Sequence, residues 1–127
     1  MTIDKDLASI QEARDKANAA QQAWLEWRHA SQGEVDQVCA AMACAGFQAS
    51  ERLGRMARDE TGYGVAAHKK LKNELGSHVV WESIRDLKTV GIVRHDPVRR
   101  VYEIAWPMGV VAALVPSTNP TSTAFNK

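Results

Sequence analysis

Residues 107–123, PMGVVAALVPSTNPTST, join an apolar run to a polar turn and a helix-start signal. Val110 to Val115 is apolar without alternation, which is typical of a strand covered on both faces in a parallel sheet. Asn119 is a favoured N-cap and Pro120 suits the first helical position, so we predict that a helix begins there. A strand that enters a helix N-terminus is the first half of a nucleotide-binding βα unit. Because one strand cannot form a parallel sheet, we expect these residues to open a larger protein.

The same region resembles a known enzyme family. Residues 115–124, VPSTNPTSTA, are similar to the first signature loop of the CoA-acylating aldehyde dehydrogenases. This family includes acetaldehyde and sulfoacetaldehyde dehydrogenases and the aldehyde half of bifunctional aldehyde-alcohol dehydrogenases. Upstream, residues 60–64, ETGYG, with Lys69 and Lys72-Asn73 after them, resemble another segment of the family at the expected spacing. The two motifs occur in the family's order, and the resemblance covers most of the chain but only the family's N-terminal portion.

The resemblance implies an α/β fold. It consists of N-terminal helices, a β-hairpin and the first βα unit of an aldehyde-dehydrogenase-type Rossmann-like domain, here truncated. Residues 1–88 are expected to be the helical part of the cofactor domain, 89–106 the oligomerisation hairpin, and 107–127 the incomplete first βα unit of the dinucleotide-binding domain. The implied reaction converts a small aldehyde, CoA and NAD or NADP to an acyl-CoA and the reduced cofactor. In the family the nucleophilic cysteine lies downstream of the matching region, so the chain alone is expected to be inactive.

The resemblance also implies particular site residues. Asn119 matches the amide that donates a hydrogen bond to the oxyanion formed when a thiolate attacks the aldehyde. Val115, Pro116, Ser117 and Thr118 are expected to line the dinucleotide site at the end of the strand. The residue types alone leave a plainer interpretation open, with Asn119 as an ordinary N-cap and its neighbours as an ordinary turn.

Composition narrows the possible partners and compartment. Sixteen Lys and Arg against fifteen Asp and Glu give a net charge of +1, so the chain has no electrostatic signature of binding to nucleic acid or an anionic membrane. Its longest nearly apolar run, 104–116, is shorter than the roughly 20 residues that span a bilayer. We therefore expect a soluble, cytoplasmic protein with no membrane partner. The four histidines show no metal-ligand spacing, and no metal site is predicted.

Helical spacing of apolar residues predicts two helices in the first half. Ile3 to Trp27 carry a narrow apolar stripe suited to packing against another helix. Family members sorted into bacterial microcompartments carry a targeting helix there, but ordinary packing is favoured. Ser31 and Glu34 form a capping-box pattern, so a second, continuous helix is predicted from there past Met56. Its Cys39 and Cys44 lie mid-helix outside any CxxC pattern, which favours reduced, structural cysteines over nucleophiles.

A third helix and a hairpin complete the predicted elements. Gly62 and Gly64 end the second helix, and the third is predicted from about Val65 to Asp86. Its lysines 69, 70 and 72 lie near a helix N-terminus, where their charge opposes the helix dipole, and we interpret them as a solvated face. Short β-type runs at 89–93 and 101–105 flank an Asp-Pro turn. By resemblance this hairpin makes the protein a homo-oligomer, and a non-catalytic association module is the alternative function.

Overall fold

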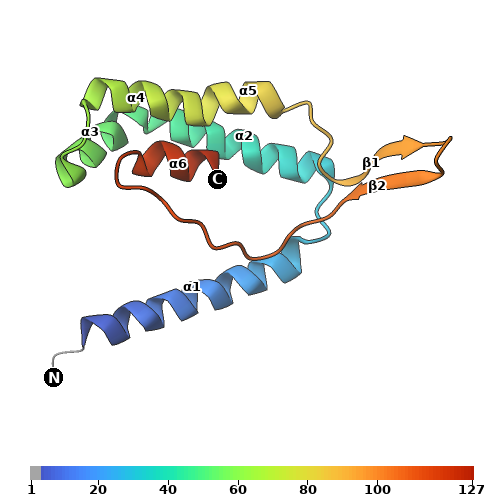
Figure 1. The fold of residues 1–127 in the computed structure, drawn as a ribbon, viewed down its shortest axis with the longest axis horizontal. Coiled ribbons are helices and arrows are strands. Elements are labelled where there is room, and N and C mark those ends of the chain that lie inside the picture. Colours follow the sequence, from blue (N-terminus) through green and yellow to red (C-terminus); the bar gives the residue numbers. More distant parts are fainter. Residues whose placement is uncertain (1–3) are drawn as a thin grey trace. The chain divides into compact units, whose positions relative to one another are not determined.

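The computed structural model describes residues 4–127, so Ile3 of the predicted apolar stripe lies outside the described residues. Figure 1 shows the elements in order: α1 (Lys5–Trp27), α2 (Gln32–Gln48), α3 (Ser50–Thr61), α4 (Ala66–Glu74), the π-helical η1 (Leu75–Val79), α5 (Val80–Ile84), β1 (Gly91–Asp96), β2 (Val101–Ala105) and α6 (Pro120–Asn126). They form two compact units. The first contains the chain up to Ala30 together with Thr89–Ala112, and the second contains Ser31–Lys88 and Ala113–Lys127.

The first unit contains the predicted N-terminal helix and the hairpin. Helix α1 begins after Asp4, whose side chain accepts a hydrogen bond from the Asp6 amide at 3.0 Å. None of its residues is fully buried, so its apolar stripe is not covered in this structure. Its C-terminal end is held by aromatic contacts instead. The Arg28 guanidinium lies 5.6 Å from the Trp24 ring, and His29 meets Trp106 edge to face at 5.9 Å.

The predicted hairpin is confirmed, with β1 and β2 paired antiparallel, but its first strand spans Gly91–Asp96 rather than the predicted 89–93. Its turn forms because Asp96 Oδ1 accepts from the amides of Val98 and Arg99 at 3.0 and 2.9 Å. Across the strands, Arg94 and Glu103 form an ion pair at 3.2 Å, and His95 stacks on Tyr102 at 4.2 Å. Such cross-strand pairs fix the register of the hairpin.

The second unit opens with the predicted capping box, which is confirmed. The amide of Glu34 donates to Ser31 Oγ at 3.3 Å, and the Glu34 carboxylate accepts from the Ser31 amide at 2.8 Å and from its hydroxyl at 2.7 Å. These bonds hold the pKa of Glu34 below its ordinary value, the backbone bond contributing most.

This lowered pKa predicts a pH dependence of the α2 N-terminus. A carboxyl whose pKa is lower in the folded state stabilises that state above its unfolded pKa of about 4.3 and loses the effect as pH falls through the folded value. We expect protection of the α2 first-turn amides, measured by hydrogen exchange, to decline over that acidic window. Glu34→Gln keeps an acceptor without a titrating group, so its protection should not follow this pH dependence. An identical decline in both proteins would contradict the assignment.

The prediction of one continuous helix past Met56 is wrong, because α2 ends at Gln48 and α3 begins at Ser50. The break is supported from outside the helix. The Asn73 side chain of α4 donates to the Ser50 carbonyl at 3.0 Å, and the Ser50 hydroxyl donates to the Gly46 carbonyl at 2.9 Å. After the break α3 packs against α4, where Gly54 allows close approach because a Cβ there would lie 2.9 Å from the Lys70 amide nitrogen.

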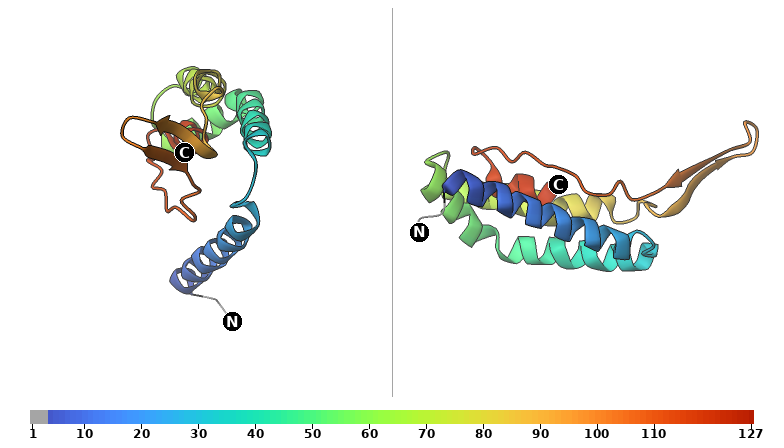
Figure 2. Two further views of the ribbon diagram at one scale, coloured as in Figure 1. Left: turned by 90° about the vertical axis from the view of Figure 1, so that its right-hand side faces the viewer. Right: turned by 90° about the horizontal axis from the view of Figure 1, so that it is seen from below.

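The predicted third helix is confirmed as an unbroken helical run through α4, η1 and α5, but its π-helical centre was not predicted. The Ser77 hydroxyl in η1 donates to the Asn73 carbonyl at 2.7 Å. Gly76 allows α6 to pack closely against η1, because a Cβ at this position would lie 2.9 Å from the Ser122 carbonyl oxygen. In Figures 1 and 2, α6 accordingly runs alongside the helices of its own unit.

Helix α6 begins at Pro120 as predicted, but the strand predicted over 110–115 is not formed. A buried parallel strand needs neighbours on both sides, and the sheet found in residues 4–127 contains only β1 and β2. The apolar run is therefore exposed, to 95% at Leu114. Within the described residues, four of the nine fully buried residues are polar, namely Ser50, Lys69, Asn73 and Ser77. The other five are small: Ala43, Ala57, Gly46, Gly54 and Gly76.

Candidate functional site

Three side chains of α4 hold the loop that leads into α6. Lys69 Nζ donates to the Thr118 carbonyl at 2.8 Å, and Lys72 Nζ donates to Asn119 Oδ1 at 3.0 Å. One residue further along, Asn73 Oδ1 accepts from the Thr121 hydroxyl at 2.7 Å. Positions i, i+3 and i+4 share one face of a helix, which is why all three reach the same loop. We call Lys69, Lys72 and Asn73 the α4 clamp.

The interpretation of the lysine segment as a solvated face is wrong for Lys69, which is only 5% exposed. A buried ammonium is costly unless it is hydrogen-bonded, and the Thr118 carbonyl oxygen meets that need. Gly64 lies beside its stem, with a Cβ there 3.6 Å from Lys69 Cε. The Thr118 carbonyl oxygen thus offsets the unfavourable position of Lys69 near the α4 N-terminus, whereas Lys72 lies in the last turn of α4.

The geometry of Asn119 bears on its two interpretations. It occupies the N-cap position of α6, yet its side chain makes no capping hydrogen bond there. Its Oδ1 is instead engaged by Lys72. A lysine ammonium can only donate, so it must face the amide oxygen, and the Nδ2 hydrogens are directed elsewhere. Asn119 therefore presents a donor at the loop, while α6 is started by Pro120 and the backbone bond from Thr123 N to Asn119 O at 3.2 Å.

The predicted cofactor residues form an exposed turn immediately before Asn119. The Asn119 amide donates to the Pro116 carbonyl at 3.3 Å, which closes the turn over Ser117 and Thr118. Val115 adds an uncovered apolar surface. Apolar surface, two hydroxyls and a nearby ammonium are chemically suited to one part of a dinucleotide site. A hollow of about 240 Å³ is lined by Asn119, Lys72 and Gly76, and by none of residues 115–118.

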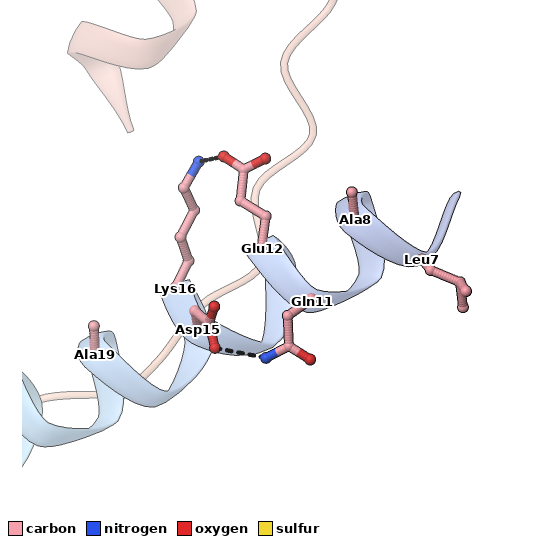
Figure 3. Close-up of a pocket in the computed structure, with 7 residues that line it drawn as sticks. All are labelled: Leu7, Ala8, Gln11, Glu12, Asp15, Lys16 and Ala19. Atoms are coloured by element: carbon pink, nitrogen blue, oxygen red, sulfur yellow. Dashed lines mark hydrogen bonds and ion pairs between the residues drawn. The ribbon is translucent and has the colours of Figure 1, made fainter. Parts of the chain in front are cut away.

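Other groups do not join this site. Cys39 and Cys44 are unpaired thiols within α2, where a mid-helix position provides no helix-dipole activation. A larger hollow lies along one side of α1 (Figure 3), but its lining comes from that helix alone, and its polar residues are already paired as Lys16–Glu12 and Gln11–Asp15. Residues 4–127 contain no cluster of three metal-binding side chains and no helix suited to crossing a membrane.

Sequence reasoning located the loop and Asn119 but missed the roles of Lys72 and Asn73. Both belonged to a motif that was noticed only as a family resemblance. The available signal was their spacing with Lys69, which places the three residues on one helix face, together with an asparagine in a helix interior, where it has poor helix propensity.

These helices, the hairpin and the loop into α6 define the first part of an aldehyde-dehydrogenase-type Rossmann-like fold, as predicted. An acetylating aldehyde dehydrogenase from Geobacillus thermoglucosidasius superposes with a TM-score of 0.93 and 45% identity, over 98% of this chain and 28% of that one. The bifunctional aldehyde-alcohol dehydrogenase of Escherichia coli K12 is 32% identical over 95% of this chain, and the acetylating succinate-semialdehyde dehydrogenase of Clostridium kluyveri is 38% identical over 91%.

The chain spans 14% and 25% of the lengths of those two curated relatives. No protein-family model matches it. The predicted resemblance to the N-terminal portion of the CoA-acylating aldehyde dehydrogenases is nevertheless confirmed by both sequence and structure.

Proposed function

We propose that this chain forms the segment of an NAD- or NADP-dependent, CoA-acylating aldehyde dehydrogenase that carries the oxyanion donor. The observation that supports this most directly is the Lys72–Asn119 hydrogen bond at 3.0 Å. It removes the amide oxygen from the site and leaves the amide N–H groups available to an incoming acceptor. The sequence and structural similarity to acetylating enzymes supports the reaction class.

In the proposed reaction, Asn119 acts on the aldehyde oxygen. That oxygen gains negative charge as a thiolate attacks the carbonyl carbon, and a preorganised Nδ2–H donor stabilises the charge more in the transition state than in the ground state. Val115, Pro116, Ser117 and Thr118 would hold part of the dinucleotide, which when bound would supply the hydride acceptor. We assign the thiolate to a residue outside these 127, because neither Cys39 nor Cys44 has an activating environment. Two unpaired thiols also support a cytoplasmic location.

A chain-swapped enzyme tests this proposal. The 127 residues replace the matching first part of the Geobacillus thermoglucosidasius acetylating aldehyde dehydrogenase, and reduction of NAD and of NADP is followed with acetaldehyde and CoA. We expect activity that requires both the aldehyde and CoA, with the unaltered enzyme as reference. A swapped protein that has the oligomeric state and melting temperature of the parent but no activity would refute the proposal.

The exposed hairpin supports association as a second role, in the enzyme or as the alternative to catalysis. Ile92 and Ile104 are cross-strand partners, and Ile104 is 63% exposed, so the hairpin offers apolar side chains and open edges to a second copy. Light scattering after size exclusion should show a homo-oligomer that Ile104→Lys dissociates. Val98→Lys at the tip of the turn, where Val98 is 91% exposed, is the matched control. A monomeric wild-type chain would rule this role out.

A further inference from the structure

We propose that Lys72 is a positioning residue, which fixes the direction of the Asn119 amide and strengthens it as a donor. This inference rests on the proposed function of Asn119. It assigns a role to a side chain of α4 that lies 47 positions away in the sequence and that the resemblance marked without explaining.

Lys72 fixes the direction of the Asn119 amide. The two ends of an asparagine amide have nearly the same shape, so rotation by 180° would exchange Nδ2 and Oδ1 at the site. An oxygen facing an aldehyde oxyanion would repel it, whereas an N–H attracts it. The Lys72 ammonium at 3.0 Å from Oδ1 favours only the arrangement in which the oxygen faces the lysine. Neither end of the amide is used to cap α6, so no other contact described for Asn119 fixes this choice.

Lys72 also strengthens the Asn119 amide as a hydrogen-bond donor. A hydrogen bond from a cation to Oδ1 polarises the amide and so strengthens its N–H groups as donors. Lys72 itself is exposed, so solvent screens the direct attraction between its charge and an oxyanion. We therefore expect Lys72 to act through Asn119 rather than directly on the substrate.

Lys72 is held in place relative to the loop by its neighbours on α4. Its neighbours in the α4 clamp are buried: Lys69 holds the Thr118 carbonyl and Asn73 holds the Thr121 hydroxyl, on either side of Asn119 in the sequence. The loop is thereby fixed against the helix that carries Lys72. Lys70 lies on the same helix but pairs with Glu74 at 3.3 Å, so Lys70→Met removes a similar charge without touching the loop. It provides the matched control.

Nuclear magnetic resonance on the 127-residue chain tests the contact itself. Hydrogen bonding to Oδ1 deshields the Asn119 side-chain carbonyl carbon, so Lys72→Met should shift its ¹³C resonance upfield, and Lys72→Arg, which keeps a cationic donor, should restore most of the shift. Lys70→Met should leave the resonance unchanged. An Asn119 carbonyl resonance that is the same in wild type and Lys72→Met would refute the contact.

Kinetics of the chain-swapped enzyme test its consequence. We expect Lys72→Met to lower kcat roughly tenfold with little change in the KM for NAD, and Lys72→Arg to recover most of the loss. In an Asn119→Ala background, Lys72→Met should cause no further loss, because its effect passes through the amide.

The outcomes separate this inference from the proposed function. If Asn119→Ala leaves kcat unchanged, the proposed function fails. If Asn119→Ala lowers kcat while Lys72→Met matches the wild type, or if the two losses multiply, only the positioning role fails. Should Lys72→Met not fold, as judged by circular dichroism, Lys72→Gln replaces it with an uncharged donor and should show an intermediate loss. A Lys72→Gln enzyme with wild-type kcat and an unshifted Asn119 resonance would then refute the role.

Discussion

Replacing Asn119 with alanine is expected to lower kcat of the chain-swapped enzyme by about 10²- to 10³-fold, the range found when one oxyanion donor is removed. The physical reason is that the Nδ2–H group acts on charge that develops only in the transition state, so its loss lowers kcat rather than raising the KM for the aldehyde. Steady-state NAD reduction at saturating CoA, with acetaldehyde varied, measures both constants. Asn18→Ala, an exposed asparagine of α1 that does not line the hollow beside Asn119, is the matched control.

The same variant distinguishes the catalytic interpretation from the N-cap interpretation. Loss of an N-cap side chain destabilises a helix by roughly 1 kcal/mol. If that were the only effect, kcat would fall only in proportion to the fraction of enzyme that remains folded. Asn119 makes no capping bond with its side chain, so Asn119→Ala should change the melting temperature little while kcat falls steeply. A lower melting temperature with kcat within about threefold of the wild type would contradict the oxyanion role.

Replacing Asn73 with alanine is expected to lower the free energy of unfolding of the 127-residue chain by about 3 kcal/mol. Asn73 is 1% exposed, and both ends of its amide are bonded, to the Ser50 carbonyl at 3.0 Å and the Thr121 hydroxyl at 2.7 Å. Alanine would remove both bonds and leave the Ser50 carbonyl and the Thr121 hydroxyl beside a small polar-lined void. Urea denaturation followed by circular dichroism gives the difference.

Asn18→Ala on exposed α1 is the control for the Asn73 variant, because it makes the same substitution where nothing is buried. It should change stability by no more than about 0.5 kcal/mol. If Asn73→Ala behaves like this control, the amide is not the connection between α3, α4 and α6 that the structure indicates.

Local patterns were sufficient to predict much of this fold. The Ser31–Glu34 capping box, the Asp96 turn and the Pro120 helix start all depend on residues within a few positions of one another, and each forms where it was predicted. Elements that depend on distant partners were not predicted. The helix break at Ala49 is supported by the hydrogen bond from Asn73 to the Ser50 carbonyl. The close packing of α6 on η1 requires a glycine at position 76, opposite Ser122. The prediction of a strand over 110–115 was wrong for the same reason, because neighbouring strands decide whether such a run forms a strand.

The candidate site shows a similar division. Asn119 and the turn of residues 115–118 were found from a resemblance and from N-cap chemistry, and their catalytic and cofactor roles stay predictions. The burial of Lys69 was missed because a run of lysines normally indicates a solvated face. Its partner is a backbone carbonyl 49 positions away, and no pattern of side-chain types can reveal such a partner.

The lack of a large apolar side chain among the fully buried residues of the described chain has a thermodynamic consequence. Exposure of apolar surface raises the heat capacity on unfolding, whereas exposure of polar surface lowers it. Ser50, Lys69, Asn73 and Ser77 are four of the nine fully buried residues, and the other five are alanines and glycines, so the apolar contribution is small. The stability of the 127-residue chain should therefore vary with temperature along an unusually shallow curve, with little tendency to cold denaturation.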